Sequence, residues 1–264
     1  MADEVLTERR DAALWLRLNR PETLNGLTPT LLDALDAGLD TAAADDDVRA
    51  VVLAARGRVF CAGADLKYAR SLLADPDTAA DRQAEFLRRV GRTLDRVEAF
   101  PKPVIAAVQG LTLAGGLELV LCADLVIAAR SAGFGDAHAN YGLLPGGGAS
   151  VRLARRVGLS RAKLMMFTGT PQPAAELAHT DLVTALVEDD QLVAEVDRVT
   201  ASIAAKSPLG LARMKQLVND GVETPLSVGL RREIEVSALH VGSADFREGL
   251  DAFNAKRTPK FTGR

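Results

Sequence analysis

Hydrophobic positions near the start of the chain follow first the alternation of a β-strand and then the spacing of an α-helix. Residues 13–19 alternate, with leucines on one face and Trp15 and Arg17 on the other, which predicts a half-buried strand. The next helix is predicted to begin with Thr28 as its N-cap and Pro29 in its first helical position. Its apolar stripe consists of Leu31, Leu32, Leu35 and Leu39.

Short apolar runs recur farther along the chain and alternate with helical patterns. Strands are predicted at residues 49–55, 103–110, 124–130 and 182–187. Helices are predicted at residues 77–99, 115–123, 148–157 and 160–167. From residue 189 onward the pattern is helical only. We therefore predict an α/β protein with a core at residues 1–188 and a C-terminal helical region at residues 189–264.

Composition and charge narrow the classes of partner. Of the 264 residues 48% are hydrophobic, and 32 basic residues face 35 acidic ones without a basic block, so nucleic acid is not expected as a partner. The apolar runs contain charges and are too short to cross a bilayer, so no membrane partner is expected either. Cys61 and Cys122 lie in apolar surroundings, which indicates reduced, buried thiols. With no secretory leader visible, we expect a cytoplasmic protein.

Two turns of small residues could bind an anion. "FCAGADLK" (60–67) and "QGLTLAGGLELVLCAD" (109–124) each follow a predicted strand and open a helix. The first N–H groups of a helix lack intrahelical partners, and the helix dipole adds positive charge there. Together the two turns could form an oxyanion hole for a polarised carbonyl. They could equally be close-packed turns that exclude side chains.

Glu118 stands among Leu, Val and Cys at the start of the second of these helices. A buried carboxylate is costly unless it is hydrogen-bonded or takes part in chemistry, so Glu118 is a candidate general base. The alternative is a favourable interaction with the positive end of its own helix. Asp124, at the start of the next strand, is expected to be a structural hydrogen-bonding acid.

His138 is one of three histidines and lies in the glycine-rich loop "FGDAHANYGLLPGGG" (134–148). It could be catalytic or fill a turn, and Asp136 or Tyr141 could set its tautomer. A metal site is not expected, because no second His or Cys lies at ligand spacing. His179 and His240 lie in helical segments and are expected to be structural or surface residues.

Four linked motifs resemble the enoyl-CoA hydratase/isomerase, or crotonase, superfamily. They are "FCAGADLK", "PKPVIAAVQGLTLAGGLELVLCADLVIAA", "FGDAHANYGLLPGGGASVRLARRVG" and "SADFREGLDAFNAKRTPKF", and the resemblance runs from about Trp15 to Phe261. It implies an α/β core of repeated ββα units and a C-terminal helical region that builds a homotrimer or a dimer of trimers. It also implies an acyl-CoA thioester as substrate, with coenzyme A as part of that substrate and no separate cofactor.

The resemblance assigns roles to individual positions. The thioester oxygen would lie between the N–H groups of Ala64 and Gly115. Coenzyme A would contact the stretch that contains Ala62, Ala64, Asp65, Leu66 and Lys67, and Gly115 would complete that surface. Phe253 and Lys256 resemble residues that reach the nucleotide end, in some cases across a subunit boundary.

In hydratases of this superfamily two glutamates flank the double bond. Glu118 matches the glutamate that activates water, whereas the second position is His138 here. The leading hypothesis is a lyase of fatty acid metabolism that hydrates a 2-enoyl-CoA, with Glu118 as base and with His138 or water supplying the α-proton. His138 could instead line the pocket. The alternative activities are thioester hydrolysis, enoyl-CoA isomerisation and weakly catalytic acyl-CoA binding.

Overall fold

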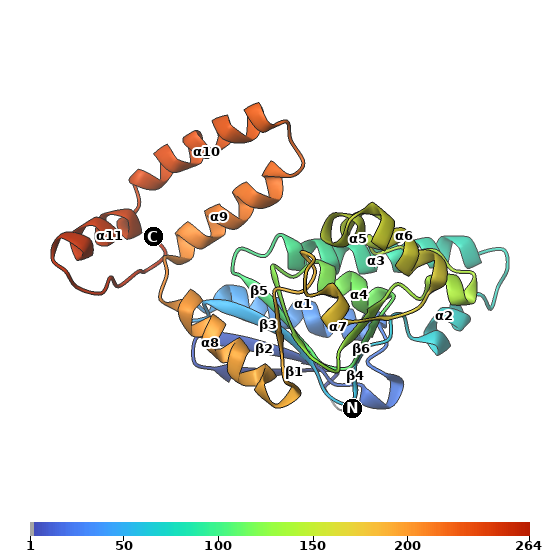
Figure 1. Ribbon diagram of the computed structural model, residues 1–264. Coiled ribbons are helices and arrows are strands. Elements are labelled where there is room, and N and C mark those ends of the chain that lie inside the picture. The colour runs from blue at the N-terminus through green and yellow to red at the C-terminus, as the bar shows by residue number, and fades with distance from the viewer. Residues whose placement is uncertain (1–2) are drawn as a thin grey trace.

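A six-stranded β-sheet runs through the computed structural model, which describes residues 3–264 (Figure 1). Its order is β1-β2-β3-β5-β7-β10, and all pairs are parallel except β1 with β2. The strands are β1 (Val5–Arg10), β2 (Ala13–Leu18), β3 (Ala50–Ala55), β5 (Val104–Val108), β7 (Leu125–Ala129) and β10 (Ala185–Val187). Strand β1 was not predicted, and β10 is shorter than the predicted segment.

A second sheet of short strands, in the order β4-β6-β8-β9, lies beside the first. Its strands are β4 (Val59–Cys61), β6 (Leu111–Leu113), β8 (Gly133–Gly135) and β9 (Gln172–Pro173). Three times in succession the chain passes from the first sheet to the second and then into a helix, as β3-β4-α2, β5-β6-α4 and β7-β8-α5. The predicted repeated ββα units of an α/β fold are therefore confirmed.

The helices of the core are α1 (Pro29–Ala44), α2 (Leu66–Leu72), α3 (Ala79–Glu98), α4 (Gly115–Leu121), α5 (Ala149–Val157), α6 (Leu159–Thr168) and α7 (Ala174–Leu177). Five of them, α1 and α3 to α6, are close to the predicted segments, whereas α7 was not predicted and α2 was expected only as a helix that a turn opens. Short 3₁₀ turns lie at Pro21–Thr23, His138–Tyr141 and Asp189–Gln191. The predicted start of α1 is confirmed, because the Leu31 N–H donates to the Thr28 hydroxyl at 3.2 Å and Pro29 is the first helical residue.

The prediction that β2 is half-buried is wrong. Trp15, expected on the open face, is 1% exposed, because helix α8 (Leu192–Ala204) covers that face of the sheet. Leu192 and Val196 of α8 belong to the same apolar cluster as Trp15. Arg17 remains beside this cluster, with its guanidinium 4.4 Å from the centre of the Trp15 ring. A polar residue at one end of a strand therefore did not indicate solvent exposure of the whole face.

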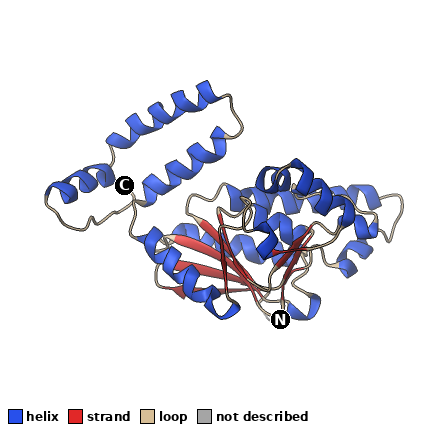
Figure 2. Cartoon of the chain, in the orientation of Figure 1, coloured by secondary structure: helices blue, strands red, loops and turns tan. Residues whose placement is uncertain are grey.

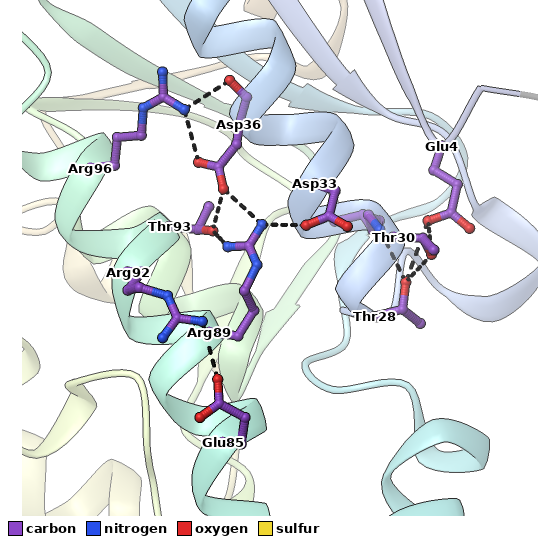
Figure 3. A network of polar contacts seen from close by, with 11 residues as sticks. Glu4, Thr28, Thr30, Asp33, Asp36, Glu85, Arg89, Arg92, Thr93 and Arg96 are labelled. Carbon is purple, nitrogen blue, oxygen red and sulfur yellow. Dashed lines mark hydrogen bonds and ion pairs between the residues drawn. The ribbon is translucent and has the colours of Figure 1, made fainter. Parts of the chain in front are cut away.

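A network of arginines and aspartates fastens α3 to α1 (Figure 3). The Arg89 guanidinium contacts Asp33 at 2.6 Å and Asp36 at 2.8 Å. Thr93 donates to Asp36 at 3.0 Å, and Arg96 donates to the Asp36 carbonyl at 3.0 Å. This network holds α3 on the outer side of the core, where its buried face packs against the helix that contains Glu118.

The last three helices project from the core as an arm (Figures 1 and 2). They are α9 (Pro208–Gly221), α10 (Leu226–Val241) and α11 (Ala244–Asn254). The predicted change to an all-helical pattern at residue 189 coincides with the end of the strands. It does not coincide with the start of the arm, because α8 packs on the sheet and the arm begins at α9. An ion pair between Lys215 of α9 and Asp124 of the core, 2.8 Å between Nζ and Oδ2, attaches the arm. No helix within residues 3–264 combines the length and apolar character that crossing a membrane requires.

The arm exposes many large apolar side chains, and α10 contains no buried residue. Those on α9 and α10 that are more than half exposed are Met214, Val218, Leu226, Leu230, Ile234, Leu239 and Val241. Apolar area of this extent usually marks an association surface. It is consistent with the homotrimer or dimer of trimers that the sequence resemblance implies.

We expect the protein to be a trimer or a hexamer in solution, because association would bury the apolar face of the arm. Ile234→Asp should shift the mass measured by light scattering toward the monomer, because a charge would be buried at the interface. The far-ultraviolet circular dichroism should be retained, because Ile234 contributes nothing to the core. A monomeric wild-type protein at micromolar concentration would contradict the expectation.

Candidate active site

The two glycine-rich turns meet backbone to backbone. Gly63 has a φ of 99°, and a side chain there would place its Cβ 2.8 Å from the Cβ of Ala114 and 3.2 Å from the Gly115 nitrogen. A Cβ on Gly115 would lie 3.6 Å from the Ala64 nitrogen. Ala114 itself has a φ of 47°, which is uncommon for a residue with a side chain. The expected pairing of the two turns is therefore present in the structure.

The N–H groups of Ala64 and Gly115 at this junction have no acceptor among residues 3–264. Nearby, the Asp65 N–H donates to the Leu27 carbonyl at 3.0 Å and the Leu27 N–H donates to the Gly63 carbonyl at 2.8 Å. These bonds fix the turn. Two neighbouring unpaired N–H groups in a fixed backbone can bind a carbonyl oxygen that gains negative charge.

Glu118 lies in the first turn of α4 and is 3% exposed. Its Oε1 accepts the N–H of Gly147 at 2.7 Å and that of Ala149 at 3.1 Å, whereas Oε2 accepts no hydrogen bond from the described part of the chain. A side chain at Gly147 would place its Cβ 2.6 Å from Oε2. Arg152 donates to the Gly147 carbonyl at 2.9 Å and so helps to hold this loop. Only one of the two carboxylate oxygens is therefore held in place by backbone N–H groups.

His138 begins a 3₁₀ turn directly after β8, and its side chain is 12% exposed. Its Nδ1 lies 3.0 Å from Oδ1 of Asp136, a carboxylate that is 1% exposed. Burial alone would lower the pKa of His138. The hydrogen bond and the charge of Asp136, with a contribution from Glu118, outweigh that effect and raise the pKa above its ordinary value. The imidazolium form is therefore favoured.

One backbone hydrogen bond joins the two halves of the site. The Ala114 N–H donates to the Gly135 carbonyl at 3.0 Å, where β6 and β8 end side by side. The turn that contains Gly115 is thereby placed next to the loop that contains His138. Glu118, the fourth residue of α4, is close enough for its charge to help raise the pKa of His138.

The other candidate residues lie elsewhere. Tyr141 is exposed and makes no hydrogen bond with the imidazole, and His179 is an exposed residue outside the site. His240 accepts from Arg213 in the arm at 2.7 Å. Asp124 accepts the Val104 N–H at 2.7 Å, so its predicted structural role is confirmed. Both cysteines are free and buried, and burial raises the pKa of Cys61 and of Cys122 to about 12.

The residues predicted to contact coenzyme A are arranged in two groups. Ala62 is half-buried and Leu66 and Lys67 are exposed at the start of α2, beside Ala64. Asp65 is buried and caps α2, because it accepts the Lys67 N–H at 2.9 Å, and it pairs with Arg20 at 3.1 Å.

Phe253 and Lys256 form the second group. Phe253 is 81% exposed, and both residues lie at the end of α11 in the arm, well apart from α4 (Figure 1). Within one chain the structure does not bring them to the junction of the two turns. Their contact with the nucleotide end of coenzyme A stays a prediction.

A sequence model of the enoyl-CoA hydratase/isomerase family matches residues 8–264. The chain belongs to this family. It is 35% identical to 2,3-dehydroadipyl-CoA hydratase of Escherichia coli over 264 residues, with 99% of each chain covered. It is also 35% identical to 1,2-epoxyphenylacetyl-CoA isomerase of the same organism over 266 residues, with both chains fully covered.

Solved structures of the family share the fold. The crystal structure of an enoyl-CoA hydratase from Bacillus anthracis superimposes with a TM-score of 0.91 at 31% identity, covering 99% of this chain and 100% of the other. The resemblance inferred from four motifs is therefore confirmed over almost the whole chain. Because relatives are named both hydratase and isomerase, family membership alone does not select the reaction.

We expect Gly63→Ala to disrupt the junction of the two turns. The added Cβ would collide with Ala114, and the backbone would be strained at positive φ, at a cost of about 1–3 kcal/mol in the free energy of unfolding. Enzymatic activity should fall with it, because the Ala64 N–H would move.

Gly91→Ala is the matched control, because Gly91 lies inside α3 and no atom is within 4 Å of the added Cβ. This variant should keep full activity and gain up to about 1 kcal/mol from helix propensity. Urea unfolding and steady-state kinetics measure both variants. Equal stability and activity of Gly63→Ala and the wild type would rule out a tight junction.

Proposed function

We propose that this protein acts on acyl-CoA thioesters and adds water to the double bond of a 2-enoyl-CoA. The observation that supports this reaction is the pair of unpaired N–H groups at Ala64 and Gly115, close to the buried carboxylate of Glu118. Such a site binds a carbonyl oxygen and has a base within reach. The hydratases among its relatives support the same class of substrate.

The thioester oxygen would accept the N–H groups of Ala64 and Gly115. This polarises the carbonyl and withdraws electrons from the conjugated double bond, so the β-carbon becomes electrophilic. As the enolate develops, its oxygen gains charge and the two hydrogen bonds strengthen, which lowers the barrier.

Glu118 would act as the general base. Its Oε1 is held by two backbone N–H groups, so Oε2 is the oxygen that takes a proton from water. The oxygen of that water then bonds to the β-carbon, and the electrons of the double bond pass to the α-carbon and the thioester oxygen.

His138 would supply the proton that the α-carbon gains. The hydrogen bond and the charge of Asp136 outweigh desolvation and raise the pKa of His138 above its ordinary value, which favours the form that can donate a proton. Hydration leaves Glu118 protonated and His138 neutral, and transfer of one proton between them restores the site. The two groups differ in charge, so neither opposes the resting state of the other.

A second candidate is isomerisation of an enoyl-CoA, which is the other activity in the description of the enoyl-CoA hydratase/isomerase family. A base and an acid on the same substrate can move a proton between the α- and γ-carbons without adding water. Coenzyme A is part of the substrate in both reactions and no separate cofactor is proposed. Phe253 and Lys256 would reach its nucleotide end from a neighbouring subunit.

Glu118→Gln should lower kcat for hydration by about 10²-fold or more, because an amide cannot accept the proton from water. The side chain keeps its shape and one acceptor oxygen for the Gly147 and Ala149 N–H groups, so the melting temperature should change little. Loss of the enoyl-thioester absorbance measures hydration. Wild-type turnover in this variant would refute the assignment of Glu118.

The same reaction mixtures separate the alternative activities. Release of free coenzyme A, detected with a thiol reagent, would indicate thioester hydrolysis, and conversion of a 3-enoyl-CoA without uptake of water would indicate isomerisation. We expect the 3-hydroxyacyl-CoA as the main product from a 2-enoyl-CoA.

A further inference from the structure

So far Asp136 enters the mechanism only through its effect on the pKa of His138, whose imidazole it contacts. We infer that Asp136 is a positioning residue, which holds the Nδ1–H of His138 and leaves Nε2 as the atom that exchanges the proton with the substrate. The inference rests on the proposed function, because it presumes that His138 handles the α-proton.

The contact fixes the tautomer. An ionised carboxylate can only accept hydrogen bonds, so the 3.0 Å contact between Nδ1 and Oδ1 requires the hydrogen on Nδ1. In the neutral ring Nε2 is then unprotonated, and in the imidazolium it holds the second proton. Either way the proton available to the substrate is exchanged at Nε2.

The alternative is that Asp136 only shapes the loop. Its Oδ1 also accepts the backbone N–H of His138, but at 3.4 Å this bond is longer than the bond to the ring. Ala137, between the two residues, has a φ of 59°, so the loop holds an uncommon backbone conformation that brings Asp136 and His138 together. The geometry favours the ring as the main partner of the carboxylate.

The charge of Asp136 also needs a counter-ion. Its Oδ2 is buried with no hydrogen-bond partner in the described chain, and within that chain His138 is the cationic group that contacts Asp136. A buried carboxylate without a cation is strongly disfavoured, so the pair is most stable with an imidazolium. Asp136 therefore favours the form of His138 that can donate a proton.

The other charged groups near His138 do not set its protonation. Tyr141 is on the same 3₁₀ turn, and Arg161 and Lys163 are on α6, which packs against that turn. None of the three contributes to the pKa of His138, which is set by burial, Asp136 and Glu118.

The first experiment follows the imidazole directly by nitrogen NMR in the free wild-type enzyme, which has only three histidines. His138 is assigned with His138→Gln. We expect the Nδ1–H tautomer for its neutral form, and a pKa that falls in Asp136→Asn, because the amide keeps an acceptor for Nδ1–H but removes the charge. An Nε2–H tautomer in the wild type, or an unchanged pKa in Asp136→Asn, would overturn the inference.

The second experiment measures hydration against pH. Asp136→Asn should move the alkaline limb of kcat to lower pH and reduce kcat by about tenfold or more, with KM nearly constant because Asp136 does not touch the substrate. Asp136→Ala, which loses the acceptor too, should be slower still. Equal pH profiles for the wild type and Asp136→Asn would contradict the inference.

A double-mutant cycle distinguishes positioning from loop shape. In His138→Gln the ring is absent, so adding Asp136→Asn should leave the residual rate of hydration nearly unchanged, whereas it lowers the rate in the wild type. A role in loop shape alone would lower both rates equally and overturn the inference. The NMR titration needs no turnover. If the titrations give the expected tautomer and pKa change but the enzyme does not hydrate a 2-enoyl-CoA, only the proposed function is refuted.

Discussion

The site depends on the close approach of two backbone turns, at Gly63 and at Ala114–Gly115. A side chain at Gly63 would collide with the neighbouring turn, and Gly115 and Gly116 are packed so closely that a Cβ on Gly116 would lie 2.3 Å from the Cys61 carbonyl oxygen. The two sheets produce this approach, because β4 and β6 are parallel neighbours and both turns follow their ends. The position of Glu118 then follows, since α4 begins at the same junction.

Much of the fold could be predicted from the sequence. Strands such as 49–55 are continuous apolar runs, and helices such as 77–99 have a long periodic stripe, so their pattern reports their burial directly. The second sheet was missed, because three-residue strands such as Val59–Cys61 are too short to show any periodicity. The burial of Trp15 was missed because it depends on α8, which lies far away in the sequence.

The candidate site was predicted in its parts and not in its contacts. The glycine-rich turns and the isolated carboxylate of Glu118 gave local signals, since both residue types are unusual where they stand. The hydrogen bonds from Gly147 and Ala149 to Glu118 join segments about thirty residues apart, and only tertiary structure shows them. The sequence left Asp136 and Tyr141 as two possible partners of His138, and only the structure, with the positive φ of Ala137, selects Asp136.

The hydrogen bond from the Ala114 N–H to the Gly135 carbonyl makes the site a single mechanical unit. A displacement of the turn that contains Gly115 is passed directly to the loop that contains His138, because the bond joins backbone to backbone. Substitutions in β6 and in β8 are therefore expected to influence one another, and their effects on the site should not be additive.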